Sequence, residues 1–161
     1  MSGKKKVIVF TTGGTIAMKY DPKVNGLVPA VSGEDLAAAV PGLDKVADVE
    51  VREFSNIASP GMIPEMMFQL SKMINEALES DDVAGAVVTH GTDTVEETSY
   101  MLDLLHQSEK PVVLTAAMRG AGDTSPDGPA NIYCAVKTAA SEEARGKGVM
   151  VLLNETIHAA G

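Results

Sequence analysis

Residues 86–105, AVVTHGTDTVEETSYMLDLL, contain a short apolar run, a polar turn and a helical pattern in direct succession. The run at 86–89 is rich in valine and is typical of a β-strand. A helix is predicted to begin near Thr94, because Thr94 and Glu97 have the spacing of a capping box. The apolar face of this helix consists of Val95, Leu102 and Leu105. A strand followed directly by a helix is the unit from which parallel α/β sheets are built.

The same alternation of strand and helix patterns extends along the whole chain. The predicted strands are residues 7–10, 49–54, 86–89, 112–115 and 149–153. Apart from 49–54, which contains three charged residues, these runs are apolar almost throughout and do not alternate with polar residues, so both faces of the sheet should be covered by helices. We therefore predict an α/β fold of the doubly wound, three-layer type, with a parallel sheet of about five strands covered by helices on both faces.

The predicted helices lie between these strands. The clearest covers 64–78, where Pro64 suits a first helical position and methionine, leucine and isoleucine side chains form one apolar stripe. Another begins near Pro129, and the lone Cys134 within it is expected to pack in the core. A shorter helix is predicted from Ser32, in SGEDLAAAV.

Length and charge limit the functions that the chain can have. Its 161 residues suffice for one core-forming domain and are too few for two of ordinary size. A formal net charge of -9 and a pI near 4.7 repel phosphate backbones, so nucleic acid is not an expected partner. The basic cluster Lys4–Lys6 is expected to be a solvated chain end.

Hydropathy and cysteine content bear on location. Lys4–Lys6 is followed by only four apolar residues, whereas a secretory segment needs roughly 7 to 15. No apolar run approaches the roughly 20 residues that span a bilayer. A single cysteine fits a reducing compartment. We therefore expect a soluble, cytoplasmic protein that has no membrane partner.

Chemistry is expected in the loops at the carboxyl ends of the strands, where doubly wound sheets bind their ligands. The first strand is followed by Thr-Thr-Gly-Gly-Thr at 11–15. Glycines allow the backbone to approach a ligand and leave amide hydrogens free to point at it. This loop contains neither a dinucleotide fingerprint nor a Walker lysine-hydroxyl pair, so by itself it fits a tight turn as well as a binding loop.

The loops after the second and third strands, SNIASPGM and HGTDTVEE, add hydroxyls and carboxylates to the same edge. Asp93 fits either a functional carboxylate or a helix-start residue, because helix N-termini favour negative charge. His90 fits either a general base or a packed histidine at a strand end. No residues have the spacing of metal ligands, so neither a metal nor a cofactor is expected. The chain has no Gly-x-Ser-x-Gly elbow, which argues against an α/β-hydrolase triad.

Taken together, these loops resemble the two signature segments of the bacterial-type L-asparaginase family. The segments are TGGTIA at 12–17 and THGTDT at 89–94. The similarity continues through EETSYMLDLL, PVVLTAAMR, SPDGPANIY and GVMVLLNETIHAA. Residues 1–161 as a whole are therefore similar to the N-terminal α/β domain of that family.

The resemblance implies hydrolysis of L-asparagine to L-aspartate and ammonia by double displacement. Thr15 would attack the side-chain amide, release ammonia and leave an acyl-enzyme that water hydrolyses. Thr92 corresponds to the second catalytic threonine of the family. Asp93 corresponds to a further catalytic residue, which binds the substrate's α-ammonium group. Ser59 corresponds to the serine that holds the α-carboxylate. Backbone amides around Gly14 and Thr92 could stabilise the oxyanion.

The chain departs from the family pattern at several positions. A family lysine that follows the last strand has no counterpart before Gly161, and the family's C-terminal domain, which completes a neighbour's site, is absent from 1–161. The activating tyrosine of the family falls near Gly26 here, which leaves Tyr20 as the nearby candidate. Pro60 follows Ser59, where a glutamine often contacts the substrate.

Three alternatives to asparagine hydrolysis therefore stay open. They are glutamine-preferring hydrolysis, a subunit of a tRNA-dependent amidotransferase, and a non-catalytic domain that binds a small amino acid; the acidic surface argues against the second. The expected partners are a small amino-acid amide and further copies of the chain, as a homo-oligomeric dimer or tetramer. The polar, glycine-bearing segment 17–29 could form a lid over the substrate.

Overall fold

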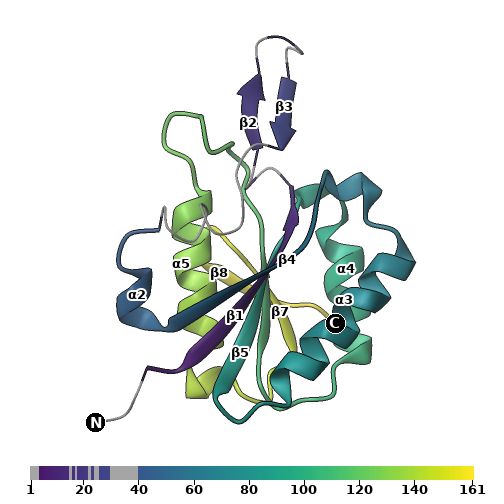
Figure 1. Ribbon diagram of the computed structural model, residues 1–161, viewed down its shortest axis with the longest axis vertical. Coiled ribbons are helices and arrows are strands. Elements are labelled where there is room, and N and C mark those ends of the chain that lie inside the picture. The colour runs from purple at the N-terminus through teal and green to yellow at the C-terminus, as the bar shows by residue number, and fades with distance from the viewer. Residues whose placement is uncertain (1–3, 15, 17, 22, 24–25, 30–39) are drawn as a thin grey trace.

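Six strands form one sheet in the computed structural model of the chain (Figure 1). Their order across the sheet is β4-β1-β5-β6-β7-β8. The strands are β1 (Lys6–Gly13), β4 (Asp48–Ile57), β5 (Val83–Thr89), β6 (Val112–Thr115), β7 (Val149–Leu153) and β8 (Thr156–Ala159). All neighbours pair in parallel except β8, which runs antiparallel to β7. The structure describes residues 4–14, 16, 18–21, 23, 26–29 and 40–161.

Helices cover both faces of this sheet (Figure 1). One face carries α3 (Pro64–Leu78) and α4 (Val95–Leu105), and the other carries α2 (Leu43–Val46) and α5 (Gly128–Ala139). Short 3-10 helices in the described part of the chain are η2 (Ser59–Gly61), η3 (Thr92–Thr94) and η4 (Glu142–Ala144). The prediction of a parallel sheet of about five strands covered by helices on both faces is therefore confirmed for β4, β1, β5, β6 and β7, and β8 adds an antiparallel strand to it.

The central strand β1 shows why the predicted strands are continuously apolar. Val7 and Val9 pack into the core beneath α2 and α5, whereas Ile8 and Phe10 pack into the core beneath α3 and α4. All four side chains are at most 3% exposed. Because successive side chains of a strand point to opposite faces, a strand buried on both faces needs an apolar residue at every position.

Most of the predicted elements are observed. All five predicted strands are present, and α3 has the predicted bounds 64–78. α5 begins at Gly128, one residue before the predicted Pro129. α4 begins at Val95 with Thr94 as its N-cap, but no side chain caps the helix, so the predicted capping-box hydrogen bond is wrong. The helix predicted from Ser32 lies outside the described residues.

Two features were not predicted. β8 adds a sixth, antiparallel strand after a tight turn, in which Asn154 and Glu155 have φ angles of 48° and 61°. The segment expected to be a loop at 17–29 contains β2 (Met18–Asp21) and β3 (Gly26–Pro29), which pair antiparallel as a two-stranded ribbon. The ribbon projects beyond the carboxyl end of β1 (Figure 1). Among the described residues, the structure has no helix with the length and apolar character needed to cross a membrane.

Candidate active site

The loops that follow β1, β4 and β5, which are predicted to carry the chemistry, meet at one edge of the sheet because β1 lies between β4 and β5. Thr11 pairs with Thr89 across β1 and β5, and Gly13 pairs with Ile57 across β1 and β4. These pairs lie at the carboxyl ends of the three strands. The segments that follow them therefore leave the sheet side by side, as the topology of doubly wound domains requires of a ligand site.

The loop after β1 packs backbone against backbone. Gly13 and Gly14 have φ angles of +102° and +80°, a region that L side chains rarely adopt. The N–H of Gly14 donates to the carbonyl of Ile57 at 3.0 Å. A Cβ on Gly14 would lie 2.4 Å from the nitrogen of Gly91. The glycines therefore allow the β1 loop to contact both neighbouring loops directly.

Gly91, in the loop after β5, lies between Gly14 in the loop after β1 and Ser59 in the loop after β4. A Cβ on Gly91 would lie 2.5 Å from Oγ of Ser59 and 3.2 Å from Cα of Gly14. Gly91 has a φ of -92°, which any residue can adopt, so the requirement here is space and not backbone conformation. Glycine at this position lets Ser59 approach the turn that carries Thr92 and Asp93.

Ser59 joins η2 to η3 through three hydrogen bonds. Its hydroxyl donates to the Asp93 carboxylate at 3.3 Å and accepts the Asp93 amide at 3.1 Å. Its carbonyl accepts the hydroxyl of Thr94 at 2.8 Å, which is why that hydroxyl does not cap α4. Ser59 is 4% exposed, whereas Asp93 is exposed and Thr92 is half-buried. The result is a buried hydroxyl beneath an accessible carboxylate.

His90 packs below this turn and is fully buried. Its Nδ1 lies 2.8 Å from the carbonyl of Gly91, which requires the proton on Nδ1, so Nε2 accepts the hydroxyl of Thr98 at 3.0 Å. Burial lowers the pKa of His90, against the opposing effects of the Gly91 carbonyl and of Glu97. Both ring nitrogens are thus engaged by neighbours, which favours the packed strand-end interpretation over the general base.

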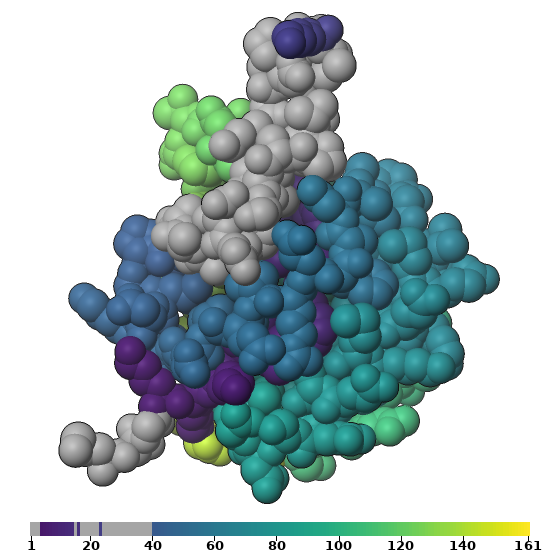
Figure 2. All heavy atoms as spheres, in the orientation of Figure 1, coloured from purple at the N-terminus to yellow at the C-terminus, as the bar shows by residue number. Residues whose placement is uncertain are grey.

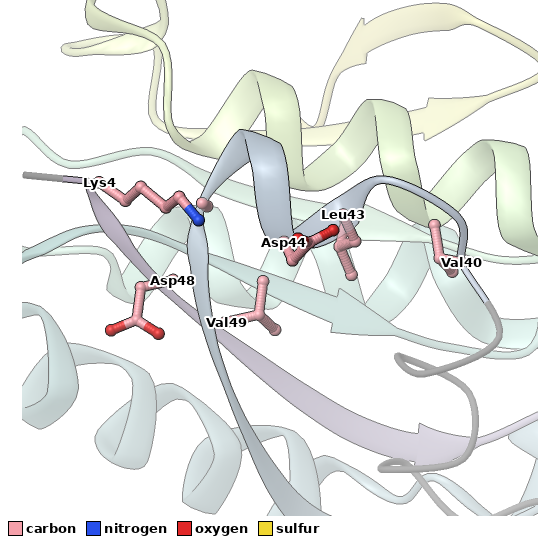
Figure 3. Close-up of a pocket in the computed structure, with 7 residues that line it drawn as sticks. Lys4, Val40, Leu43, Asp44, Asp48 and Val49 are labelled. Atoms are coloured by element: carbon pink, nitrogen blue, oxygen red, sulfur yellow. The ribbon is translucent and has the colours of Figure 1, made fainter.

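A separate hollow lies away from these loops. It has a volume of about 610 Å³ and lies between α2 and the start of β4, where Lys4, Leu43, Asp44 and Asp48 line it (Figure 3). Among the described residues that line it, none carries a hydroxyl, thiol or imidazole group. Within the described part of the chain, no three His, Cys, Asp or Glu side chains gather in a way that could hold a metal ion. The candidate site is therefore the carboxyl edge of β1, β4 and β5.

Comparison with known proteins identifies the family of this chain. The family model described as "Asparaginase, N-terminal" matches residues 6–161. The chain belongs to this asparaginase family. It is 46% identical to L-asparaginase 2-3 of Saccharomyces cerevisiae over 97% of its own length and 44% of that relative. It is 44% identical to L-asparaginase 2 of Bacillus subtilis, over 94% of the chain and 41% of the relative.

A solved structure shares the fold of this asparaginase domain. The probable cytoplasmic L-asparaginase from Campylobacter jejuni superposes with a TM-score of 0.91 at 41% identity, over 98% of this chain and 48% of that one. The chain thus spans less than half the length of the relatives it matches. The resemblance in the signature segments is confirmed as family membership.

The asparaginase domain brings together four of the six predicted site residues, namely Gly14, Ser59, Thr92 and Asp93. Thr15 lies outside the described residues. Tyr20 belongs by its backbone to β2, and its side chain lies outside the described part. The hydrogen bond from the Gly14 amide to Ile57 engages that amide within the fold, so it is not free to bind an oxyanion. Pro60 is the second residue of η2.

Sequence reasoning missed a polar network behind the next loop, which joins β6 to α5 and stands out from the body in Figure 2. The Asp127 carboxylate accepts the amides of Met118 at 3.0 Å and Arg119 at 2.8 Å. Asn131 donates to the same carboxylate at 3.2 Å and to the carbonyl of Ala116 at 2.9 Å. An aspartate in the SPDG turn just before a helix was the available signal. The network fixes the chain beyond the carboxyl end of β6.

Substitution of Gly91 tests the close approach of the three loops. Gly91→Ala should destabilise the fold by about 1–3 kcal/mol, because its Cβ must displace Ser59 or Gly14 from a packed contact. Gly122→Ala is the matched control, since a Cβ there has nothing within 4 Å and should change stability by less than about 0.5 kcal/mol. Urea unfolding measures both. Equal midpoints for the two variants would contradict the packing described here.

Asp127 should make stability depend on pH in the acid range. Burial works to raise the pKa of Asp127, but hydrogen bonds from the amides of Met118, Arg119 and Asp127 itself, together with the Arg119 charge, lower the pKa below its ordinary value. The stabilisation is therefore present above the unfolded pKa of about 3.9 and is lost as the pH falls through the lower, folded value. Asp127→Asn should cost about 1–3 kcal/mol near neutral pH.

Urea unfolding of wild type and Asp127→Asn between pH 2 and pH 7 measures this. The difference in unfolding free energy should shrink toward the acid end of that range. Asp123→Asn, in the same loop, is the control, and its smaller loss is expected because the Asp123 carboxylate accepts a hydrogen bond from the single amide of Gly120. A gap for Asp127→Asn that grows on acidification would mean that the sign is wrong.

Proposed function

We propose that the domain hydrolyses the side-chain amide of L-asparagine to L-aspartate and ammonia, with Thr15 as the nucleophile. The observation that carries the proposal is the Ser59–Asp93 pair, which lies against the loop that leads into Thr15. The curated relatives named L-asparaginase support the same reaction.

The Ser59–Asp93 pair has the chemistry needed to hold the head group of a free amino acid. The exposed carboxylate of Asp93 can bind an α-ammonium group as a charge-assisted hydrogen bond. The Ser59 hydroxyl, which now donates to Asp93, can donate to an α-carboxylate instead. Binding at the head group would direct the side-chain amide toward the β1 loop. A substrate one methylene longer would shift its amide, so the pair alone does not select between asparagine and glutamine.

In the proposed reaction, the Thr15 oxygen attacks the amide carbon and its hydroxyl proton passes to the amide nitrogen, which leaves as ammonia when the C–N bond breaks. Water then hydrolyses the acyl-enzyme to aspartate and restores the Thr15 hydroxyl. Since the Gly14 amide is bonded to Ile57, the Thr92 amide at the start of η3 is the better candidate for oxyanion stabilisation. Thr92 is proposed as the second catalytic threonine, and Tyr20, on the projecting β2–β3 ribbon, as the side chain that helps to activate Thr15. The ribbon is the candidate lid over the substrate.

Glutamine hydrolysis is the second candidate reaction. It rests on the glutaminase-asparaginase of Pseudomonas fluorescens, which is 41% identical over 94% of the chain and 42% of that relative. The ratio of kcat/KM for asparagine and glutamine distinguishes the two. We further propose a cytoplasmic location and a homo-oligomer, the former in line with the probable cytoplasmic enzyme of Campylobacter jejuni.

Removal of the Thr15 hydroxyl tests the proposed reaction. Thr15→Ala should lower ammonia release from L-asparagine by at least about 10³-fold, because the covalent step is lost while the binding groups stay in place. Thr156→Ala, on the exposed strand β8, should release ammonia at the wild-type rate. A coupled ammonia assay on purified protein measures both. Undiminished release by Thr15→Ala would rule out this nucleophile.

A further inference from the structure

The regular pairing of β1 with β4 breaks just before the glycine loop. From Lys6 to Thr11, β1 pairs residue by residue with Asp48 to Glu53. Gly13 then pairs with Ile57, so β4 contains two more residues than β1 across this break. Ladder hydrogen bonds are interrupted where a strand bulges, and other groups must hold the backbone there.

Two side-chain hydroxyls hold Thr12 at this break, one toward β4 and one toward β5. The Ser55 hydroxyl, on β4, donates to the carbonyl of Thr12 at 3.0 Å. The Thr12 hydroxyl donates to the carbonyl of Thr89, on β5, at 2.9 Å. Thr12 is 2% exposed, so neither group exchanges its partner for bulk water without cost. Thr12 is thus fixed to both neighbouring strands by hydroxyls.

The fixed residue sets where the following loop begins. Gly13 and Gly14 come directly after Thr12, and the Gly14 amide is held in turn by Ile57 at 3.0 Å. Thr15 is the next residue along the chain. We propose that Thr12 and Ser55 are positioning residues that aim the β1 loop so that Thr15 reaches the substrate amide. This proposal rests on the proposed function.

The geometry separates this role from substrate binding. The head-group pair of Ser59 and Asp93 belongs to η2 and η3, and neither the Thr12 nor the Ser55 hydroxyl bonds to it among the described contacts. Loss of either hydroxyl should therefore misplace the nucleophile and leave substrate affinity nearly intact. A shift of about 1 Å in a reacting group can cost about 100-fold in rate.

The experiment compares Thr12→Val, Thr12→Ser and Ser55→Ala in steady-state asparagine hydrolysis. Thr12→Val keeps the shape and loses the hydroxyl, and kcat should fall about 10- to 100-fold while KM changes less than about 3-fold. Thr12→Ser keeps the hydroxyl and should retain kcat within about 3-fold. Ser55→Ala, at a half-buried position, should lower kcat in the same direction and serves if Thr12→Val fails to fold.

Thr115→Val is the matched control for a merely structural effect. The Thr115 hydroxyl is also fully buried and donates to a backbone carbonyl, that of Leu152 at 2.7 Å, but on strands β6 and β7. It should lose stability like Thr12→Val and keep wild-type kcat in the folded protein. Equal kcat for the Thr12→Val and Thr115→Val proteins, or a loss in Thr12→Ser as large as in Thr12→Val, would overturn the positioning role alone. Failure of the unsubstituted chain to release ammonia would overturn the proposed function as well.

Discussion

The candidate site depends on the absence of side chains where Gly14 meets Gly91. A Cβ on Gly14 would lie 2.4 Å from the Gly91 nitrogen, and a Cβ on Gly91 would lie 2.5 Å from the Ser59 hydroxyl. No larger residue permits this approach without a shift of backbone. Because the three loops can touch, a hydroxyl, a carboxylate and the loop that carries Thr15 come from three different strands to one place. The chemistry proposed for the domain requires that convergence.

The sheet holds the backbone rigid up to this contact. Beyond the last regular strand pairing, side-chain hydrogen bonds hold the backbone in its place. β1 and β5 are anchored by cores on both faces, with Phe10 and Val9 almost fully buried. Beyond Thr11 the regular ladder stops, and the hydroxyls of Thr12 and Ser55 hold the backbone instead. Preorganised groups of this kind need not move when the reaction proceeds, which is what makes them effective in catalysis.

Sequence reasoning predicted the fold where burial dominates. Strands buried on both faces must be continuously apolar, and α3 has a proline at its first position and a clear stripe, so both were predictable. β8 was missed because all four of its residues are exposed, and its turn uses Glu155 at positive φ, which no turn rule favours. The Thr12–Ser55 hydrogen bond depends on the register shift between β1 and β4. The pattern of residues within each strand does not predict such a shift. Ser59 was identified by the family resemblance, since its local sequence SPG predicts only a turn.

Labelling with an electrophilic analogue of L-asparagine, in which a diazoketone replaces the side-chain amide, tests the central claim most directly. Trypsin should release residues 7–19 as one peptide, which contains Thr11, Thr12 and Thr15. The account predicts a single adduct whose fragmentation spectrum locates it on Thr15, and excess L-aspartate should prevent the labelling. An adduct on any other side chain, or equal labelling of the Thr15→Ala protein, would contradict it.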